Sequence, residues 1–342
     1  MSRPHTARPT DIVALVAFDG RIFPNEARPW EQLGRSSEGP RVLGSAFEQW
    51  FSFATGRATW VSVQGQTVRG VVSARRRATR QAWEIDSLIA ADQEPETVAF
   101  TLFDQVVAGA VRAGAQKVFL RLEAGSDLLT AAHRAGFVSF ARETLLRLDG
   151  AHPTDAPPPR VHLRSHEKGD SYALYQLYSR ATPQDVRRHE AVTFQEWLAA
   201  QETRGRGRGR LDMVGEQQSR ALAWVRATRE SDLGRLDLIV HPDACNETEA
   251  VLAAGLSALK QEQPVYCLVR EYARPVRERL EGAGFAACGE YVSLVKRLAL
   301  PVREPRRTRV PVPALVKPLI AKPLVPALSG RAPAPAPPLQ SA

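Results

Sequence analysis

Cysteine is scarce in this chain of 342 residues, and the three copies form no pattern typical of a metal site or a disulfide framework. Cys245, Cys267 and Cys288 all lie in the second half, without a CxxC pair and without a histidine cluster. We therefore expect reduced thiols in a cytoplasmic protein that holds no metal. Cys267 lies within an apolar run and is expected to be buried.

Long apolar runs are missing as well. The apolar stretch at 12–18 is seven residues long and is bounded by Asp11 and Asp19. This length predicts a strand and excludes a signal peptide or a spanning helix. No other stretch approaches the length that crosses a bilayer, so the sequence predicts no membrane association.

The end of the chain is the region that has few acidic residues. Residues 301–342 contain seven Lys or Arg and one acid, and they carry most of the net charge of +9. The nearly balanced charge of the preceding residues disfavours nucleic-acid binding. Eleven of the 25 prolines also lie in this tail, which predicts a disordered, polyproline-like segment suited to docking on a partner.

The most informative pattern is an internal repeat. Asp86 and Asp237 stand 151 positions apart in the similar stretches IDSLIAAD and LDLIVHPD, and the tripeptide AGF recurs at 135–137 and 283–285. A period of this length is too long for a solenoid and indicates two domains.

Apolar spacing and turn residues predict the same order of elements in both copies: strand, two helices, three strands, long helix, strand, short helix, strand. This is an α+β arrangement. In the second copy, the predicted strands are 160–164, 211–215, 221–227, 235–240, 265–269 and 291–298, and the predicted helices include 172–178 and 194–200.

Helix ends are marked by particular residues. Asn246 with Glu249 resembles a capping box, and Gly284 is expected to end the last helix in the left-handed conformation. Pro95 is expected in the first turn of the long helix of the first copy, which ends near Gly114. The predicted organisation is a first domain at 11–149, a stiff proline-rich linker at 150–159, a second domain at 160–299 and the tail at 300–342.

This order of elements, with AGF after the last helix, resembles that of GNAT-type N-acetyltransferases. The resemblance covers residues 11–149, loosely over the first 60, and 161–299. It implies two tandem GNAT-like (acyl-CoA N-acyltransferase-like) domains, each a mixed, mostly antiparallel sheet flanked by helices. It also implies acetyl-CoA or another acyl-CoA as cofactor, and an amine on a small molecule or a protein as substrate.

In that family, the cofactor's pyrophosphate binds a glycine-containing loop between the fourth strand and the long helix. The loops at 90–96 and 243–249 contain no glycine and three acids each, which favours helix caps over phosphate binding. By resemblance, the cofactor contacts of the second copy are assigned to Ile239, Val240, His241, Ala244 and Asn246.

The family's usual general acid is a tyrosine four residues before the glycine of AGF. Ala132 and Leu280 stand there instead, and neither can protonate a thiolate. Tyr272, as an acid, and Asp237, as a base for an amine, are the remaining catalytic candidates. A packing tyrosine, and a strand acid paired with an arginine such as Arg226, are the alternatives.

Two further features have ordinary explanations. His133 lies beside Ala132 on a short helix and is predicted to be a surface residue. The segment RGRGRGR at 204–210 contains GxGxG but precedes a strand, so it is predicted to be a solvated loop and not a phosphate loop.

Two functions remain open. The first is an N-acyltransferase with at most one working copy, for which the second copy is the better candidate because of its HPD at 241–243. The second is a non-catalytic tandem module, a pseudoenzyme that binds a ligand or a protein. The loops without glycine favour the second, whereas a slot between diverging fourth and fifth strands would favour the first.

Overall fold

The computed structural model describes residues 4–6, 24–35, 56–65, 67–90, 94–150, 158, 160–202, 208–259 and 263–299, with 208–210 by their backbone alone. The predicted strand at 12–18, most of the linker, the loop at 204–207 and the tail lie outside these residues. None of the described helices is both long and apolar enough to cross a membrane.

One mixed sheet of twelve strands runs through the described residues in the order β1-β2-β3-β4-β5-β12-β6-β11-β10-β9-β8-β7. All neighbours are antiparallel except β4 with β5 and β10 with β11, which are parallel. The predicted α+β class, with a mostly antiparallel sheet and flanking helices, is therefore confirmed. The strands are β1 (His5–Thr6), β2 (Arg57–Gln64), β3 (Thr67–Arg76), β4 (Ala82–Ala90), β5 (Lys117–Glu123), β6 (Val138–Leu148), β7 (His162–Ser165), β8 (Arg208–Gln217), β9 (Arg220–Arg229), β10 (Gly234–Val240), β11 (Val265–Arg270) and β12 (Ala286–Arg297).

Helices follow the parallel strands in both repeats, as the sequence predicts. The α-helices are α3 (Pro95–Arg112), α4 (Leu128–Arg134), α5 (Ser171–Ala181), α6 (Gln184–Glu190), α7 (Phe194–Ala200), α8 (Thr248–Ser257) and α9 (Arg274–Gly282). Short 3₁₀ helices are η2 (Trp30–Gln32), η4 (Lys168–Asp170), η5 (Pro242–Glu247) and η6 (Glu271–Ala273). The helix α6 was not predicted, because its sequence QDVRRHE offers only one apolar residue to mark a buried face.

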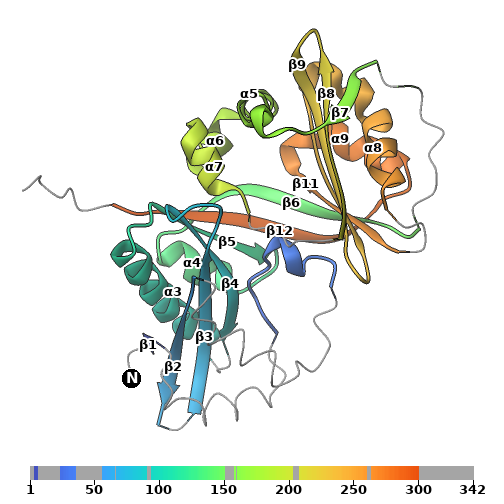
Figure 1. Ribbon diagram of the computed structural model, residues 1–342. Coiled ribbons are helices and arrows are strands. Elements are labelled where there is room, and N and C mark those ends of the chain that lie inside the picture. The colour runs from blue at the N-terminus through green and yellow to red at the C-terminus, as the bar shows by residue number, and fades with distance from the viewer. Residues whose placement is uncertain are drawn as a thin grey trace, which may run out of the picture. The chain divides into compact units, whose positions relative to one another are not determined.

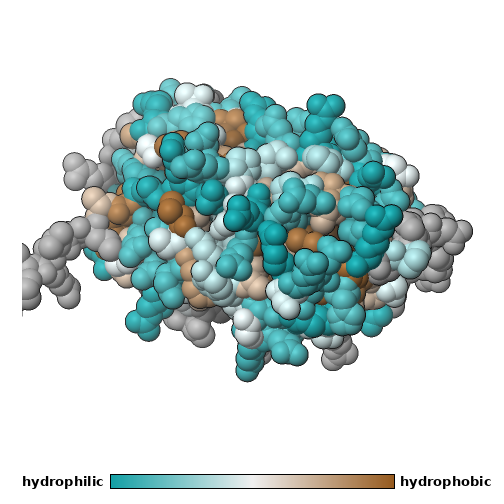
Figure 2. All heavy atoms as spheres, turned by 90° about the horizontal axis from the view of Figure 1, so that it is seen from above, coloured by the Kyte–Doolittle hydropathy of each residue, from teal (hydrophilic) through white to brown (hydrophobic). Residues whose placement is uncertain are grey.

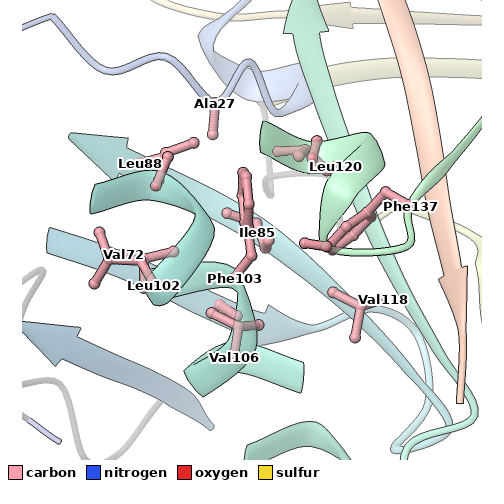
Figure 3. Packing of buried hydrophobic residues seen from close by; sticks show 14 of the residues in the cluster. Ala27, Val72, Ile85, Leu88, Leu102, Phe103, Val106, Val118, Leu120 and Phe137 are labelled. Carbon is pink, nitrogen blue, oxygen red and sulfur yellow. The ribbon is translucent and has the colours of Figure 1, made fainter. Parts of the chain in front are cut away.

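Each repeat has its own apolar core beneath its long helix. In the first, the fully buried Leu102, Phe103 and Val106 of α3 pack against strands β3, β4 and β5 (Figure 3). In the second, Leu252 and Leu256 of α8 pack against β9, β10 and β11. The apolar stripes that the sequence predicts on these two helices are confirmed.

The last strand of each repeat is exchanged between the repeats. The strand β12 lies between β5 and β6, and β6 lies between β12 and β11, so the sheet passes from one repeat to the other without a break (Figure 1). Seven residue pairs join β12 to β5, from Tyr291↔Glu123 to Arg297↔Lys117. Each repeat therefore completes its sheet with a strand that the other supplies.

Predicted helix ends are mostly confirmed. Pro95 is the first residue of α3, and Gly114 and Gly284 adopt φ of 77° and 96°, a region that glycine enters without strain. The capping box at Asn246 and Glu249 is wrong. The turn η5 precedes α8, and the Asn246 side chain donates to the neighbouring Glu247 carboxylate instead of capping the helix.

The surface is mostly hydrophilic on the face that Figure 2 shows, and its hydrophobic residues form small separate groups. The large apolar side chains exposed in the described residues are Val138, Tyr172 and Val192. Scattered apolar residues of this kind are ordinary for a protein surface.

Candidate functional site

Each repeat contains a pair of parallel strands that diverge. The strand β4 pairs with β5 only through Ala82–Glu84, and β10 pairs with β11 only through Gly234–Leu236. Both β4 and β10 continue beyond these points, to Ala90 and Val240, without pairing to their parallel neighbour. We call the diverging ends of β4 and β5 the first splay, and those of β10 and β11 the second splay. The slot that would favour an acyltransferase is thus present as a backbone feature in both repeats.

The first splay is filled by the chain's own N-terminal segment. The amide N–H of Leu88 on β4 donates to the Asn25 Oδ1 atom at 2.7 Å, and the Glu26 N–H donates to the Leu88 carbonyl at 2.8 Å. On the other side, the Arg28 N–H donates to the Arg121 carbonyl of β5 at 2.9 Å. The segment therefore bonds to both diverging strands, as an extra short strand would.

Side chains close the first splay as well. Ala27 has no exposed surface and lies beside Leu88 of β4 and Leu120 of β5 (Figure 3). Asn25 is 3% exposed, and its amide group donates to the Asp86 carbonyl at 3.2 Å. Backbone groups that a ligand would need in this splay are already paired, so the first repeat has no room for a pantetheine arm unless the segment leaves.

The replacement of Asn25 by alanine is expected to lower the free energy of unfolding by about 2 kcal/mol. The Leu88 N–H would stay buried without its partner, and an unsatisfied buried group costs about 1–3 kcal/mol. Urea unfolding followed by circular dichroism measures the change. The matched control is Asn246→Ala, because Asn246 is exposed and bonds only to its chain neighbour. Equal effects of the two substitutions would contradict a filled first splay.

In the part of the chain that the structure describes, the second splay has one strand edge without a partner. The Gly234 N–H donates to the Pro264 carbonyl on the β11 side, and the His241 N–H donates to Leu222 on the β9 side. Because backbone groups alternate along a strand, Leu238 and Val240 face β11. Within the described residues, no segment hydrogen-bonds to these two positions on that edge. Two of the predicted cofactor contacts, Ile239 and Val240, thus belong to the strand that borders the open splay.

A buried polar cluster lies at the end of β11, beside the second splay. The Arg270 guanidinium forms an ion pair with Glu190 of α6 at 2.5 Å, and the Tyr178 hydroxyl of α5 donates to the same carboxylate at 2.9 Å. Burial by itself raises the pKa of Glu190, but Arg270 and Tyr178 outweigh it, so the net pKa lies below the ordinary value. Burial, then the nearby Glu190 charge, raises the pKa of the Tyr178 hydroxyl. At neutral pH, the Glu190 carboxylate is therefore charged and the Tyr178 hydroxyl is neutral.

Tyr272, a predicted catalytic candidate, lies next to this cluster. Its hydroxyl oxygen accepts a hydrogen bond from Arg270 at 3.2 Å and lies 3.3 Å from the Thr182 Oγ1 atom. The side chain is half-buried and borders a cleft of about 480 Å³. Tyr272 therefore stands at the end of β11 with its hydroxyl positioned by two neighbours, and its role as an acid stays a prediction.

The two strand aspartates differ in their surroundings. Asp86 is 1% exposed and accepts from the Arg57 Nε atom of β2 at 2.9 Å, so it forms a buried pair with an arginine. Burial raises the pKa of Asp86 although Arg57 opposes it. Asp237 is half-buried and lies opposite Arg226 in the ladder, and Arg226 forms an ion pair with Asp212 at 2.9 Å. The catalytic role of Asp237 stays a prediction.

The beginning of α8 does not fit a pyrophosphate. The Asp243 N–H donates to the His241 Nδ1 atom at 3.1 Å, and the Ala244 N–H donates to the His241 carbonyl at 2.8 Å. These two N–H groups, at the start of the turn η5 that leads into α8, are thus already used. Glu247 is buried there and accepts from the Arg160 N–H at 2.7 Å, so negative charge lies where an anion would bind.

His241, a predicted cofactor contact, therefore caps the turn η5 with its own ring. Since Nδ1 accepts a hydrogen bond, the ring proton lies on Nε2, which is buried without a partner in the described part of the chain. Ala244 is 4% exposed and has a kinked backbone, while Asn246 is exposed. The structure brings Val240, His241 and Ala244 together at the end of β10. No glycine stands among these residues to let a ligand approach the protein backbone.

The positions of the family's general acid are apolar in three dimensions too. Ala132 and Leu280 have no exposed surface and belong to the two cores. His133 is exposed, as predicted, and its Nε2 atom lies 2.8 Å from the Ser139 hydroxyl. Cys267 is buried as predicted, and no group of three or more His, Cys, Asp or Glu among the described residues is arranged to hold a metal ion.

An ion network of alternating charges lies between the two splays. Glu143 of β6, whose side chain is 1% exposed, lies 2.6 Å from Arg121 of β5 and 3.4 Å from Arg270 of β11. Its further members are Arg77, Glu84, Glu190 and Glu202. The sequence did not predict this network, since its members are far apart along the chain and each resembles an ordinary surface charge.

Comparisons with known proteins find similarity in three dimensions only. No family model and no curated protein sequence matches the chain. A GCN5-related N-acetyltransferase from Sphaerobacter thermophilus is 14% identical over 86% of this chain and 95% of its own, with a TM-score of 0.49. A tandem GNAT protein from the clavulanic acid biosynthesis pathway is 13% identical over 87% of this chain and 99% of its own, with a TM-score of 0.47. A GCN5-related N-acetyltransferase from Kribbella flavida is 12% identical over 86% of this chain and 70% of its own, with a TM-score of 0.46.

At these identities and scores, the similarity concerns shape and carries nothing about activity. The GNAT-like fold stands on the chain's own features: the repeated order of elements, the parallel pair that diverges in each repeat, and the long helix that follows β4 and β10. The resemblance to GNAT-type acetyltransferases that the sequence shows is confirmed as a resemblance of fold.

Proposed function

We propose that the protein is an N-acyltransferase of the GNAT kind in which only the second repeat is competent. The observation that carries the proposal is the edge of β10 at Leu238 and Val240, which no described segment pairs with, in contrast to the first splay that the N-terminal segment closes. An extended amide-bearing arm, such as the pantetheine of an acyl-CoA, can bond to such an edge as an added strand does. Acetyl-CoA is the simplest such donor, and the amine that accepts the acyl group is unknown.

The second candidate is a non-catalytic tandem module. The capped turn η5 before α8 and the apolar Ala132 and Leu280 support it, because neither a phosphate cradle nor the usual acid is present among the described residues. The two candidates differ in one measurable property. An acyltransferase must bind the thioester in the second splay, whereas a module of the other kind need not.

The replacement of Leu238 by proline is expected to abolish acetyl-CoA binding. Proline removes the N–H that faces the second splay, and this N–H has no ladder partner in the described residues, so the sheet loses no hydrogen bond. Calorimetric titration of acetyl-CoA into the full chain measures binding. Affinity in the micromolar range is expected for the wild type, since millimolar binding would be too weak for a specific donor.

The control is Leu163→Pro on the edge strand β7. The His166 N–H donates to Asp212 of β8, so by alternation the Leu163 N–H faces away from β8. Both substitutions thus place proline at a strand N–H outside the ladder, and Leu163→Pro is expected to leave binding intact. Absent or millimolar binding by the wild type would overturn the acyltransferase proposal and leave the module.

A further inference from the structure

A cleft of about 480 Å³ lies at the junction of the two repeats and has no part in the proposal above. It is bordered by α4 and β6 of the first repeat and by α6, η6 and β12 of the second. Leu129, Phe140, Val186 and Val292 give it an apolar wall. A cleft of this size and composition matches a small organic molecule, because ligand pockets measure about 300–1,000 Å³.

Two opposite charges border this cleft without pairing. The ladder between β6 and β11 ends at Glu143↔Arg270, so the next residues along each strand, Arg142 and Glu271, stand opposite each other beyond its end. Both side chains are exposed and both line the cleft. In the described part of the chain, neither forms an ion pair or a side-chain hydrogen bond. Their neighbours Glu143 and Arg270, by contrast, are both paired.

The unpaired charges decide what the cleft can hold. A simple anion would meet the Glu271 carboxylate, and a simple cation would meet the Arg142 guanidinium. A purely apolar ligand would cover both charges without replacing their water, which is costly. A molecule with one charge of each sign and an apolar group satisfies all three parts of the cleft.

We propose that this cleft binds a zwitterionic α-amino acid with an apolar side chain. Arg142 receives the carboxylate, for which its planar fork is suited, and Glu271 receives the ammonium group. The Ser139 hydroxyl, held at 2.8 Å from the His133 Nε2 atom, offers one further polar contact at the same border. The apolar wall receives the side chain. This binding does not depend on whether the second splay takes an acyl-CoA.

Calorimetry with the full chain and free L-leucine, L-methionine or L-phenylalanine tests the proposal. At least one of them is expected to bind with Kd below about 1 mM. For the leucine skeleton, 4-methylpentanoate lacks the ammonium group and 3-methylbutylamine lacks the carboxylate. If leucine binds, each of these analogues is expected to bind at least tenfold more weakly, because one charge in the cleft would stay unmatched.

Variants locate the binding. Arg142→Gln and Glu271→Gln are each expected to weaken the amino acid's binding at least tenfold. The matched controls Arg134→Gln on α4 and Glu278→Gln on α9 remove exposed charges that do not line the cleft, and they are expected to leave it unchanged. The proposal is overturned if none of the three amino acids binds at about 1 mM. It is also overturned if binding survives Arg142→Gln undiminished. Acetyl-CoA titrations of the same proteins report on the second splay separately.

Discussion

The replacement of Leu294 by proline is expected to unfold both repeats in one transition. Leu294 has no exposed surface and lies in β12, opposite Leu120 of β5 on one side and Ser139 of β6 on the other. Loss of the buried side chain costs about 2–5 kcal/mol, and a ladder group left unpaired costs about 1–3 kcal/mol more. This sum is comparable with the whole stability of a typical protein, about 5–15 kcal/mol.

Hydrogen exchange measured by mass spectrometry shows where the effect falls. Peptides from β2–β4 and from β8–β10 are both expected to lose protection, because β12 joins the first repeat's sheet to the second's. Leu163→Pro on the edge strand β7 is the control and should leave both sets protected. Loss of protection in one repeat alone would show that the exchanged strands do not couple the two.

The replacement of Glu143 by leucine is expected to cost about 3–5 kcal/mol of stability. The carboxylate lies between Arg121 and Arg270 and also accepts from the Ser293 hydroxyl at 2.9 Å. Removal of Glu143 takes one of two close counter-charges from the buried Arg121, which keeps only Glu202, and breaking a buried ion pair by removing one partner is costly. Burial lowers the pKa of Arg121, but Glu143 and Glu202 outweigh it, so the arginine stays charged.

A second substitution tests this explanation. Arg121→Leu added to Glu143→Leu is expected to recover part of the loss, because an apolar pair replaces a buried arginine that has lost one counter-charge, and Glu202 keeps Arg77 as a partner. Equilibrium unfolding in urea measures both variants. The control is Glu278→Gln, which removes an exposed i,i+4 partner of Arg274 and is expected to change stability by less than about 0.5 kcal/mol. A double variant as unstable as the single one would contradict the role of Glu143 as a counter-charge.

Local patterns were sufficient to predict most elements. The apolar spacing of α3 and α8, the proline at the first residue of α3 and the glycine after α9 depend on neighbours in the sequence, and all three are confirmed. The capping box at Asn246 failed because the turn η5, which the His241 ring caps, runs through Asn246 to Glu247, so α8 begins only at Thr248. A histidine as cap is not part of the usual pattern, which prefers Ser, Thr, Asp and Asn.

The candidate site was predictable only in part. The sequence shows that the loops lack the glycines that bind phosphate. The structure adds that His241 takes the first N–H groups of η5, before α8, so these groups cannot replace the glycines. The sequence could not show that Asn25 fills the first splay, because its partner Leu88 is 63 positions away and no periodicity connects the two residues. The same holds for Arg142 and Glu271, which a strand pairing between the repeats brings together.

The exchanged strands also set the order in which the protein can be completed during synthesis. When β6 has left the ribosome, β5 has β4 on one side but still lacks β12 on the other, since β12 ends only at Arg297. At about 5–20 residues per second, this delay is on the order of 10 s. For that time the first repeat presents an unpaired strand edge, the feature that most readily pairs with another chain. The nascent protein therefore depends on β12 to cover the open edge of β5 in the first repeat.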